Sequence, residues 1–562
     1  MMKEKKFTAV ILAIVTVIVI GAAYYYVELP AINIHAPGFW KFIIVLMVII
    51  TVAYCVFNAT FTEKYKTFKN RQMKSHKLVF RTGTAKIVGN GLIIATLAIV
   101  IIYIAGSILS SEIINASAYQ RLLKVENRDF TEDIKEVSYD KIPILDKDSA
   151  STIGNRVMGT IVDMVSQFEV SDMYSQINYN NKPVRVSPLQ YGNLIKWFTN
   201  HSSGIPAYIS IDMTTQQAEC VRLSEPIKYS KSDHFGRNIY RHLRFAYPAY
   251  IFDDVNFEID DNGTPYWICS RIVKTIGLFG GTDVKGAVLV NAVTGEHEYY
   301  EEVPTWVDHV YDAELIVQQY DYYGRYQHGF INASIGQKGV TKTTAGYNYI
   351  ALDDDVYVYT GITSVGADES NIGFILTNQR TKETKFYAVA GAEEFSACES
   401  AEGVTQDLKY TATFPILLNV NGRPTYFMSL KDSAGLVKMY AMVNVQQYQI
   451  VATGTTVENC RQSYEKLLLE KNVISKEEVT TNEISGQIAE IRTAVVNGTS
   501  YYYVRLNVNT DVYYVVSAAE NPTVIICNVG DSARINYRET DKENALVNAT
   551  DFAITGKADG AV

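Results

Sequence analysis

The sequence predicts three N-terminal transmembrane helices, an α+β region built from repeats of a helix and an antiparallel meander, and a small C-terminal β barrel. Three observations lead to this fold class. Three long uncharged apolar runs lie near the N-terminus, a strand–turn–strand pattern recurs after them, and five short alternating segments lie near the C-terminus. A chain of 562 residues is long enough for several domains with real cores.

The composition excludes several classes of protein. With 40 Tyr, 22 Phe and 48% hydrophobic residues, most of the chain does not have the composition of a disordered protein. Thirteen Pro and six Cys exclude collagen and disulfide-dense scaffolds. Residues 1–111 carry twelve Lys or Arg against three Asp or Glu, whereas the rest of the chain carries 39 against 57. This division indicates a basic membrane anchor followed by an acidic folded region.

The three apolar runs cover about residues 7–27, 42–62 and 87–111, within an anchor at 1–111. Each reaches the roughly 20 residues that a helix needs to cross a bilayer, and a helix satisfies its own backbone groups inside lipid. The alternative for the first run is a cleaved signal peptide, because Gly21-Ala22-Ala23 resembles a cleavage site, but the run is long for a signal. We therefore expect a multi-pass protein in the lipid bilayer.

The loop charges predict the orientation of these spans. Lys residues precede the first run, and the loop at 28–38 has no Lys or Arg. The loop between the second and third runs is strongly basic, with Glu63 as its acid. Because basic residues stay in the cytoplasm, we expect a cytoplasmic N-terminus and an extracytoplasmic chain from about residue 112 onward. The basic residues of the second loop, which we assign to topology and anionic lipid and not to nucleic acid, are Lys64, Lys66, Lys69, Arg71, Lys74, Lys77, Arg81 and Lys86.

The folded region is expected to begin after a stalk at 112–150 and to contain internal repeats. Helical spacing predicts helices at 152–168, 311–326, 393–403 and 457–470, the last closing the array. Strand-like segments and turns fill the chain between these helices. The four repeats that we infer span residues 151–225, 226–310, 311–392 and 393–478.

The second repeat has the clearest pattern. Asp261-Asn-Gly-Thr has the composition of a turn, and the segment from Gly286 to Tyr300 reads as a strand, a tight turn at Thr294-Gly295 and a strand. Gly277-Leu-Phe-Gly-Gly-Thr looks like a phosphate loop but lacks the Lys-Ser/Thr ending, so we predict a hairpin loop there.

The segment Gly286 to Tyr300 resembles the end of PepSY-type modules, in which a helix precedes a small antiparallel sheet. The whole layout also resembles an uncharacterised group of bacterial membrane-anchored proteins, through Leu194-Ile-Lys-Trp-Phe-Thr-Asn and Val303-Pro-Thr-Trp-Val-Asp. The resemblance implies an envelope module that binds peptides or restrains peptidases.

Residues 479–541 are predicted to form a small barrel of the OB or SH3 type, followed by a tail at 542–562. Turns are expected at Asn497-Gly498 and Gly530-Asp531, and one of the five predicted strands is Val524-Ile-Ile-Cys. The run Tyr501-Tyr502-Tyr503 suggests a stacking platform for single-stranded nucleic acid. We favour a structural role, with Tyr502 in the core, because no basic cluster accompanies the run in sequence, and we expect no nucleic-acid partner.

The sequence contains no recognisable catalytic or cofactor motif. The eight His include no His-x-x-x-His pair, and no nucleophile elbow, P-loop or Gly-x-Gly-x-x-Gly occurs. The neighbours Asp233-His234 and Asp308-His309 would point to opposite faces of a strand, so neither is a ready dyad. We therefore predict no cofactor and no metal. The extramembrane cysteines, expected to be mostly unpaired with one disulfide possible, are Cys220, Cys269, Cys398, Cys460 and Cys527.

Acidic clusters offer an alternative site for Ca²⁺. Asp253-Asp254, Asp260-Asp261 and Asp353-Asp354-Asp355 supply oxygen ligands, but they lack the alternating spacing of a calcium loop. We interpret them as solvated turns.

The best localised candidate site is a set of three arginines. Arg237, Arg241 and Arg244 have spacings of four and three, which would place them on one face of a helix. Such a face is either a clamp for an anionic group of a partner or the solvated side of an amphipathic helix.

These observations favour a non-enzymatic envelope protein that presents its repeats to a peptide, a protein or a cell-wall ligand. A membrane-tethered envelope hydrolase is the alternative, and it would require a His and two carboxylates within reach in one cleft. A scaffold subunit is the third hypothesis, because small residues at Gly106-Ser107 and Ser110-Ser111 would allow a membrane-protein partner to approach the third span.

The predicted orientation can be tested with a membrane-impermeant thiol reagent on intact cells. A cysteine introduced near Thr550 should be labelled, because that residue is expected outside, and one near Ser75 should not. The opposite pattern would show that the topology is inverted.

Overall fold

The structure is a computed structural model that describes residues 2–68, 71–136, 142–352, 354–366, 371–475, 482–496, 499–543 and 545–558. The chain forms two compact units. Unit 1 comprises Met1–Phe130, Pro143–Ile416 and Met428–Lys438, and unit 2 comprises Thr131–Ile142, Leu417–Phe427 and Met439–Val562.

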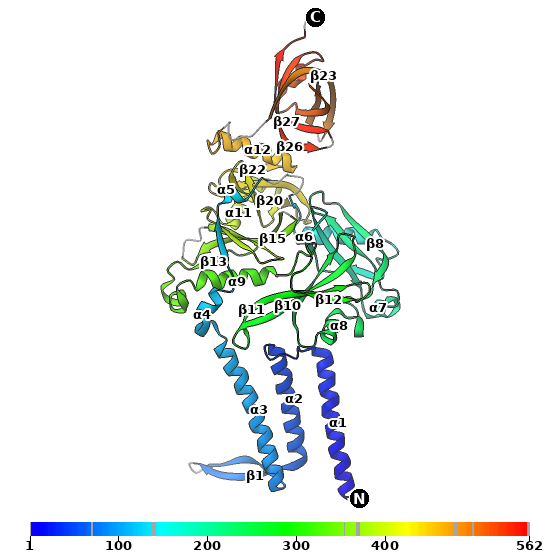
Figure 1. Ribbon diagram of the computed structural model, residues 1–562, viewed down its shortest axis with the longest axis vertical. Coiled ribbons are helices and arrows are strands. Elements are labelled where there is room, and N and C mark those ends of the chain that lie inside the picture. The colour runs from blue at the N-terminus through cyan, green and yellow to red at the C-terminus, as the bar shows by residue number, and fades with distance from the viewer. Residues whose placement is uncertain are drawn as a thin grey trace. The chain divides into compact units, whose positions relative to one another are not determined.

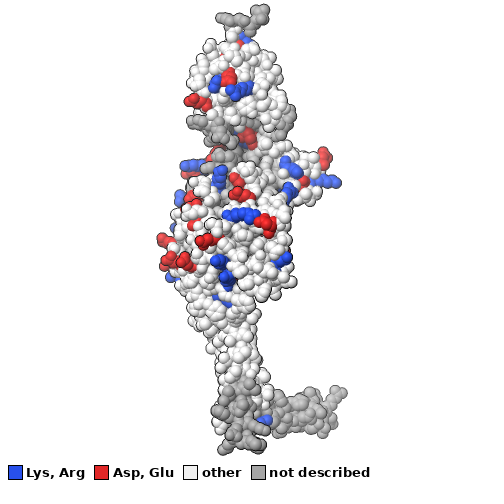
Figure 2. Space-filling model, turned by 90° about the vertical axis from the view of Figure 1, so that its right-hand side faces the viewer, with Lys and Arg blue, Asp and Glu red and all other residues white. Residues whose placement is uncertain are grey.

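Three apolar helices open unit 1: α1 (Met2–Glu28), α2 (Pro37–Asn58) and α3 (Gly83–Leu109) (Figure 1). Among the described residues, α2 and α3 are long and apolar enough to cross a membrane, and the described apolar part of α1, Ile14–Glu28, is shorter. On the face that Figure 2 shows, the described part of these helices carries almost no charge. The chain therefore begins with two or three helices that could be membrane spans.

The predicted second span at 42–62 ends too late. The helix α2 stops at Asn58, and Ala59 begins an antiparallel hairpin of β1 (Ala59–Phe68) and β2 (Arg71–Phe80). Alternation of Thr and Phe with charged residues suits a strand better than a helix in lipid. The described side chains do not include those of residues 59–79, which make up most of the basic second loop. Lys69 lies outside the described residues altogether.

Three sheets, mostly antiparallel, form the bulk of unit 1. Their helices have the caps that local sequence provides; at α9, for example, the Asp312 side chain accepts from Glu314 N. The first sheet contains β4 (Phe168–Val170), β5 (Ser175–Tyr179), β6 (Lys182–Tyr191), β7 (Ile205–Asp212) and β8 (Ala218–Ile227). The second has the order β12-β11-β10-β9, from β9 (Ile251–Ile259), β10 (Pro265–Ile276), β11 (Gly280–Asn291) and β12 (His297–Tyr300). The third contains β13 (Thr341–Thr343), β14 (Asn348–Leu352), β15 (Asp355–Ser364), β16 (Asn371–Asn378) and β17 (Thr384–Tyr387).

A fourth sheet follows, with the order β18-β20-β21-β22 and β19 paired to β20. Its strands are β18 (Thr411–Ala412), β19 (Ile416–Val420), β20 (Arg423–Lys431), β21 (Val437–Asn444) and β22 (Val451–Gly454). A helix precedes each sheet in the chain. These helices and the closing one are α6 (Lys147–Gly159), α8 (Ile239–Ala246), α9 (Ala313–Arg325), α11 (Glu394–Val404) and α12 (Val457–Glu470).

The helix predictions at 311–326, 393–403 and 457–470 are confirmed by α9, α11 and α12, and the first predicted helix begins earlier and is shorter, as α6. The hairpin predictions are also confirmed. The loop after Gly277 joins β10 to β11, and Gly295, at φ +80°, lies in the turn between β11 and β12.

The predicted stalk at 112–150 is wrong in its described parts, because this segment packs into the body. It forms α4 (Glu112–Gln120) and β3 (Val125–Arg128), and β3 pairs in parallel with β17 as the edge strand of the third sheet. Tyr119, Leu123 and Phe130 are buried. Apolar side chains at this spacing make the segment part of a core instead of a spacer; residues 137–141 lie outside the described ones.

The tip of the β10–β11 hairpin contacts the end of α3. Leu278 N and Phe279 N donate to Ser110 Oγ at 2.8 and 3.1 Å, and a methyl group at Gly106 would lie 2.6 Å from Leu278 Cδ1. Gly106 and Ser110, which were predicted to offer a surface to a membrane-protein partner, are thus partly covered by the protein's own hairpin.

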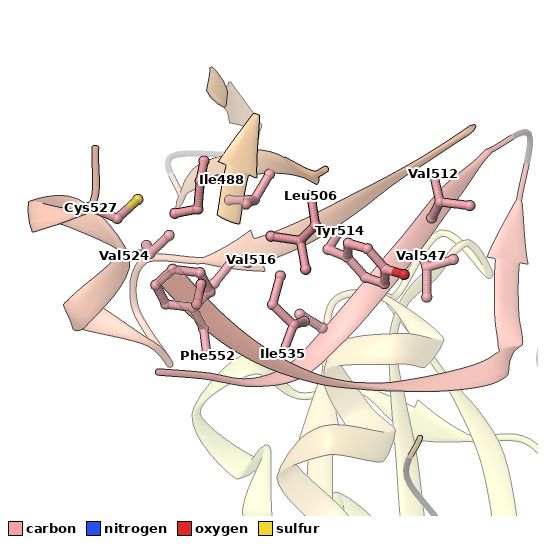
Figure 3. Packing of buried hydrophobic residues seen from close by; sticks show 13 residues of the cluster. Ile488, Leu506, Val512, Tyr514, Val516, Val524, Cys527, Ile535, Val547 and Phe552 are labelled. Atoms are coloured by element: carbon pink, nitrogen blue, oxygen red, sulfur yellow. The ribbon is translucent and has the colours of Figure 1, made fainter. Parts of the chain in front are cut away.

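In unit 2, the C-terminal strands form a closed barrel in the order β23-β24-β25-β27-β26. The strands are β23 (Asn482–Val496), β24 (Thr499–Leu506), β25 (Asn509–Ser517), β26 (Ser532–Glu543) and β27 (Leu546–Gly556). Inward-facing side chains such as Leu506, Val516, Ile535 and Phe552 fill the interior (Figure 3).

Two predictions for this region are wrong. Val524-Ile-Ile-Cys is not a strand, because Pro522–Ile526 forms a 3₁₀ helix, and the predicted tail at 542–562 contains the fifth strand, β27. Pro522 suits the first turn of a helix, and the alternation of β27 buries Val547, Ala549 and Phe552. The predicted turn at 497–498 lies outside the described residues.

We expect the fragment 479–558 to melt cooperatively and the fragment 479–543 to show no transition by circular dichroism. The strand β27 pairs with both β25 and β26, so its removal opens the barrel and exposes the core. A cooperative transition in the shorter fragment would show that β27 is dispensable for closure.

Candidate functional site

A cavity of about 730 Å³ lies among the three sheets of unit 1. Its wall comes from β5 and β6 of the first sheet, β9 of the second, the start of β14 in the third, and the N-terminal ends of α6 and α9. A second cavity of about 530 Å³ shares Asp254, Asn256, Asp312, Glu314 and Tyr347 with it. Because the two cavities share this wall, we describe them together as the acidic groove.

Carboxylates dominate the charge of the first cavity. Six acidic and three basic side chains line it. Asp254 pairs with Lys231 at 2.6 Å, and Asp146 pairs with Lys431. The acidic lining residues are Asp146, Asp148, Asp172, Asp254, Asp312 and Glu314, and the basic ones are Lys147, Arg185 and Lys231.

The paired acids are held in their charged form. Burial acts to raise the pKa of Asp254, but hydrogen bonds from Lys231 and Tyr240 lower it below its ordinary value. Asp148, Asp172 and Glu314 make no ion pair with any described residue. With six acidic and three basic lining side chains, the groove has a net negative charge.

Aromatic and amide side chains complete the wall. Tyr174, Tyr347, Tyr349 and Phe414 line the first cavity beside several Asn and Gln residues. The Tyr174 hydroxyl is buried without a hydrogen-bond partner in the described structure, and burial raises its pKa well above its ordinary value. Such a wall can pack against apolar stems and bond polar groups of the same ligand.

Arg185 is a buried cation in this wall. Its side chain is 3% exposed, Nη2 donates to Gln176 Oε1 at 3.2 Å, and Nε has no partner in the described structure. Burial lowers its pKa, yet arginine stays protonated. A carbonyl or carboxylate oxygen would satisfy the free donor.

His309 lines the cavity as a neutral ring. Burial lowers its pKa to about 4, and Nε2 lies 2.6 Å from the Gln176 carbonyl oxygen. The ring nitrogen that donates to this carbonyl is therefore engaged and unavailable for proton transfer to a ligand.

Two buried carboxyls lie behind the wall. Glu258 accepts from Asp308 N at 2.9 Å and His309 N at 2.8 Å, and Asp308 Oδ2 accepts from Asn178 N at 2.7 Å. Burial raises the pKa of Glu258 to about 7. Burial and the charge of Glu258 together raise the pKa of Asp308 well above its ordinary value.

This cluster brings a His and two carboxyl groups together. The carboxyl groups accept hydrogen bonds from backbone amides, however, and not from the imidazole ring. Neither Glu258 nor Asp308 lines the cavity. The sequence predicts that Asp308 and His309 are neighbours in a strand. In the structure they lie in the loop between β12 and α9. The hydrolase alternative requires a His side chain bonded to carboxylates in a cleft. These three residues do not form that geometry.

The arginines predicted as a clamp do not share one helix face. Arg237 lies before α8, and its Nη1 donates to the His201 carbonyl at 2.5 Å. Arg241 stacks on the Tyr26 ring at 4.2 Å and donates to the Phe235 carbonyl. Arg244 is buried, and its Nε donates to the Leu29 carbonyl at 2.8 Å. Arg241 and Arg244 thus contact the end of α1, whereas Arg237 bonds within the body, and clamping of a partner stays a prediction.

The acidic clusters do not gather around one point. Asp260 accepts from Asn262 N and Thr264 N within a turn, Asp355 pairs with Arg380, and Asp353 lies outside the described residues. Among the described residues, no three His, Cys, Asp or Glu side chains are grouped as metal ligands would be. All six cysteines are unpaired.

The barrel tyrosines are arranged as the structural interpretation predicts, with one difference. Tyr502 packs against the core, so its neighbours face outward. Basic side chains do accompany this outer face: Arg492 and Arg505 lie 5.4 and 5.1 Å from the Tyr513 ring, and both pair with Glu490.

Sequence reasoning missed the acidic groove because its residues come from segments far apart in the chain. The Asp308-His309 pair was the local signal available. No protein-family model and no curated protein match the chain. A solved structure of a mutant levansucrase from B. megaterium is similar over 76% of this chain and 95% of its own, at 7% identity and a TM-score of 0.17, which carries no argument about fold or activity.

We expect Asp308→Asn to raise the melting temperature at pH 7.5 and to raise it by a smaller amount at pH 5. A carboxyl whose pKa is raised on folding contributes stability at low pH that is lost as pH rises past its unfolded pKa, and the amide removes this loss. A tenfold change in the proton affinity of the carboxyl corresponds to about 1.4 kcal/mol of unfolding free energy. His309, whose pKa is lowered on folding, has the opposite pH dependence in both proteins and cancels in the comparison.

Thermal unfolding in detergent from pH 5 to 8 measures this difference. The matched control is Asp312→Asn, because that exposed cap can be replaced by asparagine with little loss. A difference between wild type and Asp308→Asn that does not vary with pH would contradict the raised pKa.

Proposed function

We propose that this protein is a non-enzymatic binding protein of the bacterial cell envelope, held in the cell membrane by α1 to α3. The N-terminus lies in the cytoplasm, and the chain from about residue 112 lies outside. The division of charge supports this orientation, since the loop between α1 and α2 has no Lys or Arg and the loop between α2 and α3 is strongly basic.

The ligand of the acidic groove is a peptide that carries basic side chains, from a protein or from the cell wall. The observation that carries this proposal is the lining of the groove, which has a net negative charge and in which Asp148, Asp172 and Glu314 make no ion pair with a described residue. Ammonium or guanidinium groups would supply that partner. The aromatic wall suits the apolar stems of such side chains, and Arg185 suits a peptide carbonyl.

The binding body is, in this proposal, an array of PepSY-like repeats followed by an OB-type barrel. A helix before each of four antiparallel sheets supports the repeats. Two features favour an OB over an SH3 arrangement: β23 pairs with both β24 and β26, and β25 pairs in parallel with β27.

Binding is favoured over the hydrolase alternative by the state of the titratable groups. The two carboxyls whose pKa is raised lie behind the wall, and the neutral His309 ring is bonded to a backbone carbonyl. A general acid must touch the reacting bond, and the two carboxyls do not line the cavity.

Binding of tetralysine to the full-length protein in nanodiscs tests this function. We expect tetralysine to bind more tightly than tetraglutamate, and the double variant Asp172→Asn, Glu314→Gln to weaken tetralysine binding about tenfold, or ~1.4 kcal/mol. Higher salt should weaken binding by the wild type. Isothermal titration calorimetry measures each affinity.

The matched control is Glu399→Gln with Asp407→Asn, which removes two exposed acids that do not line the groove. This control should bind tetralysine like the wild type. Equal losses in both double variants would mean that net charge, and not the groove, attracts the peptide. No preference for tetralysine over tetraglutamate would overturn the proposed ligand class.

A further inference from the structure

Two exposed apolar patches lie beside the membrane helices in unit 1, outside the predicted spans. The first, which we call the α7 patch, contains side chains that are 57% to 72% exposed. The second, the α4 patch, contains side chains that are 54% to 83% exposed. The α7 patch consists of Leu194, Ile195, Phe198, Phe235 and Phe245, and the α4 patch consists of Ile113, Ile114, Ile331 and Ile335.

Each patch is continuous with a membrane helix. The helix α4 begins three residues after α3 ends, and its Ile113 and Ile114 are exposed in the first turn. The short helix α10 (Gly329–Ile331) and the π-helical turn at Asn332–Gly336 pack on α4. Ile331 and Ile335, four residues apart, lie on one side of this turn.

A chain of contacts joins the α7 patch to α1. Phe245 packs edge-on against Tyr25 at 6.2 Å, and Arg241 stacks on Tyr26 and donates to the Phe235 carbonyl. Phe235 in turn lies 5.9 Å from Trp197 of α7 (Leu194–Asn200). Figure 1 shows α4 and α8 above the upper ends of α3 and α1, with α7 to the right of α8 at the edge of the body.

Each patch also carries a lysine without an ion pair in the described part of the chain. Lys196 lies among the apolar residues of α7, and Lys338 follows the turn that carries Ile335. Apolar side chains next to a free lysine are typical of segments that lie in the interface of a bilayer, where the ammonium group meets lipid phosphates.

We propose that the occupant of both patches is the outer leaflet of the bilayer that α1 to α3 cross, so that the body sits in the membrane surface and is not held above it. This inference rests on the proposed membrane anchoring. Burial in the interfacial layer removes large apolar side chains from water. Without a bilayer, patches of this kind would be exposed to water on an isolated chain.

Site-directed fluorescence in nanodiscs of phosphatidylcholine and phosphatidylglycerol tests the inference. The parent carries Cys55→Ser, Cys220→Ser and Cys398→Ser, because these thiols are the partly exposed ones. Single cysteines at Ile195→Cys and Ile331→Cys receive an environment-sensitive dye. Lipids spin-labelled near the headgroup serve as one quencher, and aqueous iodide serves as the other.

We expect shallow spin-labelled lipid to quench the dye at 195 and 331 several-fold more strongly than at Val404→Cys, and iodide to show the reverse order. Val404, at the end of α11, is the matched control because it is similarly exposed and apolar but lies away from the helix bundle (Figure 1). Equal melting temperatures of the labelled proteins confirm that they are folded.

Leu97→Cys, in α3, reports on the anchor itself. In one outcome, deep spin-labelled lipid quenches the dye at position 97, but the dyes at 195 and 331 are quenched no more than the dye at 404. This would show that the patches do not lie in the bilayer surface, although the anchor does cross it. Loss of quenching at 97 would overturn both. Protection of 195 and 331 from lipid and iodide alike would show that a second copy of the chain covers the patches, which also overturns the inference.

Discussion

The hydroxyl of Ser110 is the point on which the arrangement of unit 1 depends. It accepts two backbone N–H groups from the tip of the β10–β11 hairpin and donates to the Gly106 carbonyl at 2.6 Å. Turn amides at the end of a hairpin need acceptors, and a site beside an apolar helix has little water to supply them. Gly106 makes the approach possible, because a larger residue would displace Leu278.

The loop between α1 and α2 strengthens the same attachment. Arg244 donates to the Leu29 carbonyl at the end of α1, Ile32 N donates to the Pro248 carbonyl at 2.7 Å, and His35 Nδ1 lies 2.9 Å from the Leu278 carbonyl oxygen. The last carbonyls of a helix have no partner within it, and here the body provides one. The apolar helices and the sheets of unit 1 thereby form one compact unit. The hairpin that contacts α3 also lines the acidic groove through Ile272, Thr282 and Val284, so the groove and the contact with α3 share a pair of strands.

Sequence patterns predicted the elements whose signals are local. The apolar runs gave the anchor helices, helical periodicity gave α9, α11 and α12, and Thr294-Gly295 gave a tight turn. The stalk was missed because β3 exists through pairing with β17, about 260 residues away in the chain, and no local pattern announces an edge strand of four residues. The fifth barrel strand was missed because its alternation is weak.

The candidate site was beyond local patterns for the same reason. The arginines attracted attention by spacing, yet spacing says nothing about which backbone carbonyls a fold will bring to them. The acidic groove unites residues of three sheets and two helix ends, and none of its segments carries a motif. The sequence shows that these residues are acidic. Only the tertiary structure decides which of them form ion pairs.

The buried carboxyls behind the groove connect its shape with the stability of the fold. Glu258 accepts the amides of Asp308 and His309, and this fixes the loop that carries His309 into the wall and leads to Asp312 at the cap of α9. Keeping a carboxyl there costs free energy at neutral pH, since burial raises its pKa. Two adjacent amides require two acceptor oxygens, and a carboxyl group is the side chain that provides both without an N–H directed at either donor. The protein retains an unfavourable buried acid because the shape of the groove depends on the loop that this acid holds.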